Sequence, residues 1–340
     1  MCATESYFAG CLVESDRCIV SSLRRRPTKP AEESYTSAFD RWYDRSSVRS
    51  APRRQLTNVN AAESMFSPAL TPLLRSATFG ETVDDSVRNA TIQQALRYLR
   101  GTAFLESRIV NSVVLDIAES GMGLQLPERM RVDAYRIYTD EAYHAQFSVE
   151  LASQITELTG SGAAAADAPP TFYTSLIQLE SRLDPSYSSL VRFLFVICSE
   201  TLITGSLSNA AQDEGVSAPI RSALRDHAHD EGRHHVYFSS MLRILWDQLD
   251  DRARRFSAFV IPELINIFCA PDIPTIRAEL AMYGLERPQA DEIVDEVFPE
   301  QSANAGTRAS AAHLLKLLAD IGISHYDAEV EAAYAEFGFA

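Results

Sequence analysis

Two segments of the sequence each place a glutamate and a histidine three residues apart: DEAYH at 140–144 and DEGRH at 230–234. At about 100° of rotation per residue, two helical positions three apart lie about 60° from each other. In each segment the glutamate and the histidine therefore project from one helix face and can bind the same metal ion. One E-x-x-H tetrapeptide is weak support, because the pattern occurs by chance in many helices. Its repetition strengthens the prediction of a metal site.

A glutamate in an apolar setting precedes each of these segments. Glu106 lies in GTAFLESRIV, and Glu200 follows the run FLFVIC. A buried carboxylate without a partner costs on the order of several kcal/mol or becomes neutral, and a metal ion removes that cost. The order Glu, E-x-x-H, Glu, E-x-x-H predicts a two-metal carboxylate site in a four-helix bundle. Carboxylates with one imidazole per metal favour iron or manganese over zinc, whose structural sites favour thiolates.

A third histidine, His227, lies four residues before Glu231. With Glu231 at 0° on a helical wheel, His227 falls at about −40° and His234 at about −60°, so the three share a face. His229 falls at about 160° and His235 at about 40°, which predicts a solvent-facing His229 and a His235 beside the site. His227 is thus a candidate extra ligand; a histidine that binds no metal is the alternative.

An aspartate precedes the glutamate in both segments, at Asp140 and Asp230. A histidine that binds a metal through one ring nitrogen usually donates the other N–H to a carboxylate or a carbonyl. We expect Asp140 and Asp230 to orient the histidine of the opposite segment. A solvated or capping role is the alternative for both.

The elements that must position these residues are helices. Apolar residues repeat at helical spacings, which in residues 86–119 mix threes, fours and fives, and alternating strand patterns are almost absent. Pro127 and Pro219 stand where helices begin, and GSGAAAADAPP at 160–170 has a loop composition. The sequence predicts an all-α protein with four long core helices and additional C-terminal helices. The long helices are expected at 86–119, 128–158, 185–213 and 219–249, and the shorter ones near 251–269, 273–284, 288–297, 305–321 and 325–336.

Composition limits the classes of protein that the chain can be. It has 340 residues, 46% hydrophobic and 23% charged, which excludes a mainly disordered chain. The net charge of −15 argues against nucleic acid and anionic membranes as partners. Five cysteines without a CxxC pair favour a reduced, cytoplasmic protein, and no apolar run suggests a membrane span.

The first 60 residues differ from the rest of the chain. They hold ten Lys and Arg against seven Asp and Glu, and they are rich in Ser, Arg and Pro. We expect residues 1–60 to form a partly disordered N-terminal arm, with a short amphipathic piece near Phe39–Tyr43. Residues 61–340 are expected to form a single helical domain.

Taken together, these motifs resemble the di-iron arylamine N-oxygenase family. Its type members are the p-aminobenzoate N-oxygenase of aureothin biosynthesis and the arylamine oxygenase of chloramphenicol biosynthesis. The family pattern is Glu, then D-E-x-x-H, then Glu followed by Thr, then H-x-x-x-E-x-x-H. It is matched by Glu106, DEAYH at 140–144, SET at 199–201 and HAHDEGRH at 227–234. The resemblance covers roughly residues 60–270, and the third histidine is its distinguishing mark.

The resemblance implies a ferritin-like fold, often as a homodimer, with two iron ions that activate O2. It implies a monooxygenase that oxidises an amine nitrogen, most often an arylamine, to hydroxylamine, nitroso or nitro products in antibiotic-type metabolism. Glu141 and Glu231 would bridge the two irons, and an external ferredoxin, flavin reductase or peroxide would supply the electrons. By this carry-over the iron ligands are Glu106, Glu141, His144, Glu200, His227, Glu231 and His234.

The substrate pocket is expected one or two turns from these ligands. Apolar residues at Ala103, Val110, Phe195, Ile203 and Leu207 are the candidates for its lining.

Three other classes of protein are compatible with the sequence. A ribonucleotide reductase radical subunit or an acyl desaturase would use a similar ligand set without the third histidine, and Tyr138 or Tyr143 could carry a radical. An iron-storage protein would bind many irons per chain. A metal-free helical scaffold would tolerate replacement of Glu200 by leucine.

Overall fold

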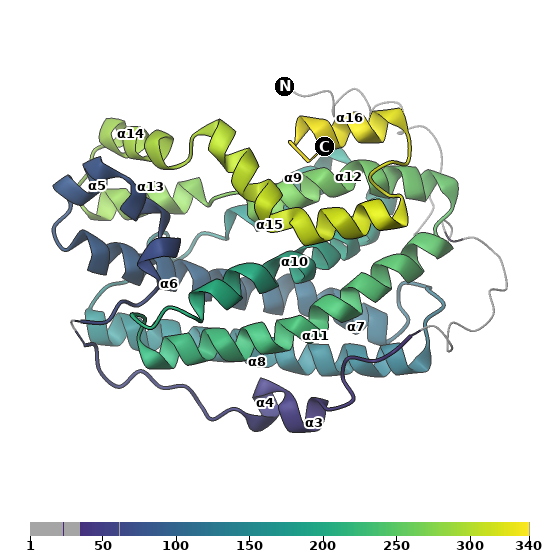
Figure 1. Cartoon of the computed structure of the whole chain (residues 1–340), viewed down its shortest axis with the longest axis horizontal. Coiled ribbons are helices and arrows are strands. Elements are labelled where there is room, and N and C mark those ends of the chain that lie inside the picture. Colours follow the sequence, from purple (N-terminus) through teal and green to yellow (C-terminus); the bar gives the residue numbers. More distant parts are fainter. Residues whose placement is uncertain (1–22, 24–34, 61, 340) are drawn as a thin grey trace.

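The chain folds into helices packed around one elongated bundle (Figure 1). The computed structural model describes residues 23, 35–60 and 62–339, without the side chains of residues 204–208 and 300–305. Helices make up most of the described part of the chain, and that part contains no strand. The prediction of an all-α protein is confirmed.

Four long helical segments form the core of the bundle. α6 (Ser86–Leu105) continues through the π-helical turn η4 (Glu106–Val110) into α7 (Asn111–Ala118), and this rod packs along α8 (Glu128–Thr159). α10 (Ser188–Ala210) packs along α11 (Ala218–Gln248), and α8 contacts α11. α8 and α11 lie side by side along the long axis of the molecule (Figure 1). The four predicted core helices therefore exist, with ends within a few residues of the expected ones.

The first long helix is interrupted by one wide turn. η4 has π-helical hydrogen bonding over Glu106–Val110, whereas regular α-helix precedes and follows it. A π turn accommodates one extra residue in a helix and is frequent at functional sites. It accounts for the apolar spacing of five from Phe104 to Ile109.

Shorter helices cover one side of the bundle. α12 (Asp251–Cys269) packs on α10 and on α9 (Thr171–Arg182), a helix that the sequence did not predict, and α15 (Glu300–Ile321) packs on α10 and α12. Aspartates cap several of their N-termini: Asp250 accepts from the backbone N–H of Ala253 at the start of α12. The remaining helices are α5 (Ala77–Thr82), α13 (Ile273–Met282), α14 (Arg287–Val297), α16 (Ala328–Glu336) and the 3-10 turns η2 (Pro68–Leu70), η3 (Pro72–Arg75) and η5 (Pro185–Tyr187).

Two helical stretches of the described chain are long and apolar enough to span a membrane by length and composition. They are Pro185–Ile203 and Asp251–Met282, and 78% and 56% of their most apolar windows are buried inside the fold. Packing in the core therefore accounts for their composition. The absence of a membrane partner stays a prediction.

Residues 35–56 run across the outer side of α8 and α11, and we call this segment the strap. It contains the short helices α3 (Trp42–Arg45) and α4 (Ser47–Ser50), which lie beside α8 and α11 in Figure 1. Phe39 and Trp42 are buried in the main core. The part of the predicted arm at 1–22 and 24–34 lies outside the described residues, and the boundary expected at residue 60 stays a prediction.

Candidate metal centre

The helices bring all seven predicted ligand residues to the centre of the bundle. α8 supplies Glu141 and His144, α10 supplies Glu200, and η4 supplies Glu106. α11 supplies the other three. Every one of the seven side chains has 0% of its surface exposed to solvent: Glu106, Glu141, His144, Glu200, His227, Glu231 and His234.

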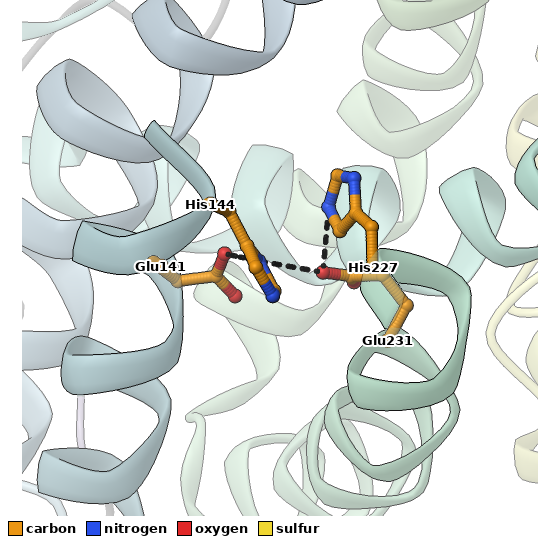
Figure 2. A group of neighbouring side chains, drawn as sticks. All are labelled: Glu141, His144, His227 and Glu231. Carbon is orange, nitrogen blue, oxygen red and sulfur yellow. Dashed lines mark hydrogen bonds and ion pairs between the residues drawn. The ribbon is translucent and has the colours of Figure 1, made fainter. Parts of the chain in front are cut away.

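One group of four residues lies between α8 and α11 and is drawn in Figure 2. Glu141, His144, His227 and Glu231 each offer a ligand atom, and these atoms lie within 4.8 Å of one another. His144 Nδ1 lies 2.8 Å from Glu141 Oε2, and His227 Nε2 lies 3.2 Å from Glu231 Oε1. This spacing suits one metal ion with two imidazole ligands.

A second group shares two of these residues. Glu141, Glu200, Glu231 and His234 also offer ligand atoms within 4.8 Å of one another. His234 Nδ1 lies 2.7 Å from Glu141 Oε1 and 3.6 Å from Glu200 Oε2. Because Glu141 and Glu231 belong to both groups, the geometry favours them as bridges between two metal ions. Their roles as ligands stay a prediction.

Glu106 lies at the edge of the first group. Its Oε1 is 3.9 Å from His227 Nε2, and Glu106 is the first residue of the π turn. Burial raises the pKa of Glu106 well above its usual value, and the nearby charges of Glu141, Glu200 and Glu231 raise it further. Glu106 therefore interacts electrostatically with the other three glutamates of the cluster.

Several polar atoms of the cluster are buried without a hydrogen-bond partner. They include both carboxylate oxygens of Glu106, Glu200 and Glu231, together with His227 Nε2 and His234 Nδ1. More than nine-tenths of buried polar groups in folded proteins are hydrogen-bonded, so such a concentration needs an explanation. Four ionised glutamates carry four negative charges, which two divalent cations would balance. The donor set therefore fits two iron ions.

The cluster without cations holds protons in place of metal ions. Burial alone would lower the pKa of His144, but the carboxylates of Glu141 and Asp230 outweigh burial and raise it to about 10. The pKa of His234 is raised well above its usual value by Glu141 and Glu231 against the same effect of burial. The pKa of Glu200 is raised mainly by burial, and the negative charges of Glu231 and Glu141 raise it further.

The two aspartates pair with the histidines in the crossed order that the sequence suggests. Asp230 Oδ2 lies 3.1 Å from His144 Nε2, and Asp140 Oδ2 lies 3.4 Å from His234 Nε2. In both histidines Nδ1 thus faces the glutamates and Nε2 faces an aspartate. An aspartate that accepts from Nε2–H fixes the tautomer in which Nδ1 is free to bind a metal.

His227 has the opposite orientation. Its Nε2 faces the cluster, and its Nδ1 lies 2.9 Å from the hydroxyl of Tyr98. When Nε2 binds a metal, Nδ1 carries the proton and donates to the phenol oxygen. The sequence analysis missed Tyr98, whose position eight residues before Glu106 is the only signal that places it on the same helix face.

The other candidate residues lie away from the cluster. His229 is half exposed, and His235 lies beside α10 with a pKa that burial lowers. Tyr138 is 38% exposed, and Tyr143 is partly exposed. Neither tyrosine is enclosed as a radical-bearing side chain beside the metals would be.

A cavity of about 420 Å³ lies between α6, α8 and α9. Ala103 and Ser107 line it on the rod that carries Glu106, and Ser148 lines it one turn beyond His144. The hydroxyl of Ser148 is buried without a partner. The cavity thus begins about one helical turn, some 5 Å, from two predicted ligands.

Of the five predicted lining residues, Ala103 lines this cavity. Phe195 lies behind its wall, stacked on the lining residue Phe172 with ring centroids 6.4 Å apart. Val110 and Ile203 are buried elsewhere in the core. The side chain of Leu207 lies outside the described residues.

One comparison with known protein families matches most of the chain. The family model described as p-aminobenzoate N-oxygenase AurF matches residues 39–322. This range contains the seven predicted ligands, both aspartates, the cavity and most of the strap.

Proposed function

The chain belongs to the p-aminobenzoate N-oxygenase AurF family and is a di-iron N-oxygenase, and from this premise we propose that its substrate is an arylamine that carries a carboxylate. The buried cluster of four glutamates and three histidines, with oxygen and nitrogen atoms that lack hydrogen bonds, supports the di-iron chemistry, and the proposed substrate class rests on Arg100 in the neighbouring cavity. When bound, two ferrous ions would supply the electrons that activate O2. Each oxidation puts one oxygen atom of O2 on the nitrogen, and the other leaves as water with two protons and two electrons from an external donor.

The residues of the chain would hold the iron ions, exclude bulk water and keep the ligand histidines in one tautomer. Glu141 and Glu231 would bridge the metals, and the aspartates would hold Nε2–H of His144 and His234. The hydroxyl oxygen of Tyr98 would accept a hydrogen bond from His227 Nδ1–H. The complete burial of the ligands keeps their electrostatic interactions strong.

The cavity beside the cluster is our candidate for the substrate site. Phe104 and Phe172 give it an aromatic wall that suits a planar ring. Arg100 also lines this cavity, and its guanidinium donates to the carbonyl oxygens of Ala164 and Ala166. Among the described residues Arg100 has no carboxylate partner, so its positive charge is available to an anionic substrate.

The neighbouring charges support this choice of anchor. Arg97, which also lines the cavity, is already paired with the buried Glu279 at 2.7 Å. Asp272 accepts from the hydroxyl of Thr171 and caps the N-terminus of α13. Arg100 is therefore the cationic side chain of this cavity that a carboxylate would meet.

The first test of the function counts iron and identifies the product. The protein reconstituted anaerobically should bind two ferrous ions per chain, and after exposure to ¹⁸O2 with p-aminobenzoate it should yield a product with ¹⁸O on nitrogen. Two irons with a sharp tyrosyl-radical signal and no oxidised amine would favour a radical subunit instead. Many irons per chain would favour storage, and no bound iron would overturn the metal site itself.

The anchor has a separate test. We expect Arg100→Ala to lower kcat/KM for p-aminobenzoate at least tenfold, the scale of a lost charge-assisted hydrogen bond of about 1.5–3 kcal/mol. Aniline has no carboxylate, so its turnover should stay within about twofold. Arg100→Lys should restore part of the loss, and Arg88→Ala, an exposed arginine of the same helix, is the control. Equal losses for both amines would remove Arg100 from substrate binding.

The setting of the enzyme is part of the proposal. We propose a cytoplasmic homodimer that acts in antibiotic-type metabolism and takes electrons from a ferredoxin or a reductase. The odd number of cysteines and the absence of a CxxC pair support the reduced compartment. Sedimentation of the purified protein tests the dimer.

A further inference from the structure

The strap contacts both aspartates beside the metal centre, Asp140 and Asp230, as well as the ligand His234. It carries five arginines and two aspartates in a chain of net charge −15. Arg54 forms an ion pair with Asp226 on α11, and Arg53 forms one with Glu150 on α8. These pairs tie the strap to both helices that hold the aspartates.

One hydrogen-bond chain starts at Trp42. The indole N–H of Trp42 lies 2.9 Å from each oxygen of Asp140, which in turn faces His234 Nε2 at 3.4 Å. Trp42 and Asp140 are both buried, so water does not compete for these bonds. Phe39, also from the strap, stacks on the His234 ring with centroids 6.0 Å apart.

A second chain starts at Ser47. Its backbone N–H lies 3.2 Å from both oxygens of Asp230, and its hydroxyl donates to Oδ2. The same Oδ2 faces His144 Nε2 at 3.1 Å. Arg233 provides Asp230 with a further donor.

We propose that Trp42 and Ser47 are positioning residues that each fix one ligand histidine, so that the strap sets the hold on the two metal ions separately. Trp42 acts through Asp140 on His234, which belongs to the group with Glu200. Ser47 acts through Asp230 on His144, which belongs to the group with His227. The inference rests on the proposed two-metal function.

The two hydrogen-bond chains differ in how many donors each aspartate keeps when its partner in the strap is lost. Without the indole N–H, Asp140 keeps His234 and a distant Arg233, whose nearest nitrogen is 3.8 Å away. Without the Ser47 hydroxyl, Asp230 keeps the backbone N–H and Arg233. Loss of the Trp42 bond should therefore weaken metal binding more than loss of the Ser47 bond.

The experiment measures the release of ferrous ions to an excess of a coloured chelator under anaerobic conditions. The reconstituted full chain is compared with Trp42→Phe, which keeps a large ring but removes the donor, and with Ser47→Ala. Replacing outer partners of metal ligands typically costs 10–100-fold in affinity or activity. We expect one iron per chain to leave at least tenfold faster in Trp42→Phe and the second to stay within threefold. In Ser47→Ala the other iron should leave faster, by a smaller factor. In the double variant the release of both irons should be accelerated.

The controls separate positioning from general loss of stability. Trp246→Phe changes the other tryptophan, which is similarly buried and contacts Tyr326 and Arg254 near the end of α11. It should leave both release rates unchanged. Ser47→Thr keeps the hydroxyl and should restore the parent rate. Thermal unfolding of each variant without iron shows whether the fold itself is weakened.

The outcomes distinguish the inference from the function on which it rests. A parent protein that binds fewer than two irons would overturn the proposed function. A parent that binds two irons, with unchanged release in both strap variants, would overturn the positioning role alone. Acceleration of both irons to the same extent in every variant, including Trp246→Phe, would also overturn it, because a merely structural role moves both phases together.

Discussion

Glu200 shows how a single residue can reveal a site. Residues 193–198, which precede it on α10, are all buried and apolar, and its own carboxylate is fully buried with no hydrogen bond to either oxygen. A protein that did not use this charge would gain stability by replacing it, since buried ionic groups are often no better than hydrophobic residues of similar volume. The residue is therefore explained by metal binding rather than by folding.

Glu200→Leu should separate these two roles. We expect the variant without iron to be more stable than the parent, by about 1–3 kcal/mol, because a buried carboxyl group without a hydrogen bond is replaced by an apolar side chain. We also expect it to hold fewer than two irons per chain and to lose amine oxidation. Thermal unfolding without iron and a colorimetric iron count measure the two effects.

Glu279 offers a matched control. It is also fully buried, but it pairs with Arg97 at a distance from the cluster. Glu279→Leu should destabilise the protein, because it leaves a mostly buried arginine unpaired, and should keep both irons. A Glu200→Leu protein with two irons and full activity would instead support the metal-free scaffold.

Five of the seven candidate ligands could be predicted from the sequence because each lies within about one turn of another ligand on the same helix, whereas Glu106 and Glu200 stood out as carboxylates in apolar segments. The spacing of Glu141 and His144 or of His227 and Glu231 is local information. Trp42 and Asp140 are 98 residues apart, and Ser47 and Asp230 are 183 apart. Contacts between separate elements leave no periodicity in a single sequence, so the strap partners could not be found in this way.

At the scale of elements, the π turn η4 sets the direction of Glu106 relative to the residues that follow the turn. A regular helix through 86–118 would place residues after the turn about 100° away from their observed direction. The spacing of five in the sequence was the sign of this turn, although the segment was interpreted as one continuous helix. The wide turn lets Val110 and Val113 stay in the core while Glu106 reaches the cluster.

Deletion of Ser107 should convert the π turn into regular α-helix. Ser107 is exposed, so the deletion removes the extra residue without removing core packing. We expect helix content measured by circular dichroism to stay constant, and binding of one of the two irons to weaken at least tenfold because Glu106 is displaced. Ser107→Ala removes only the hydroxyl bond to Ala103 and should bind both irons normally. Unchanged iron binding in the deletion variant would show that Glu106 is not needed.

The elements that the sequence missed have a common cause. α9 has only two buried residues, Leu176 and Leu179, and follows a loop rich in Ala, Gly and Pro. The strap has the Ser, Arg and Pro content of a solvated segment, yet Phe39 and Trp42 bury it against the bundle. Both segments are ordered by tertiary contacts, which local composition does not report.

At the scale of the whole molecule, the seven fully buried ligand side chains occupy the centre of the core. Without cations, the cluster at the centre of the four helices has to hold protons on His144 and His234. Metal ligands bind in their deprotonated form, so metal binding displaces these protons. The stability of the whole fold should therefore depend on metal and on pH together.

The sign of this dependence follows from the histidines. The pKa of His144 is about 10 in the folded chain without metal, against about 6.5 in an unfolded chain, so its contribution to stability is complete below pH 6.5 and is lost as the pH rises toward 10. His234 and the raised carboxyl groups of Glu106 and Glu200 act in the same direction. The lowered pKa values of Glu141 and Asp230 matter only in acid.

Calorimetry of the protein with and without Co²⁺ at pH 6.5 and 8.5 tests this expectation. Each displaced proton changes the binding free energy by about 1.4 kcal/mol per pH unit, so the stabilisation by metal should grow by at least about 2.7 kcal/mol over this range. The melting temperature without metal should fall toward pH 8.5, and the temperature gap to the loaded protein should widen. A constant gap would mean that the histidines are already neutral before metal binds. A narrowing gap would mean that metal binding takes up protons, which would contradict the displacement of protons from His144 and His234.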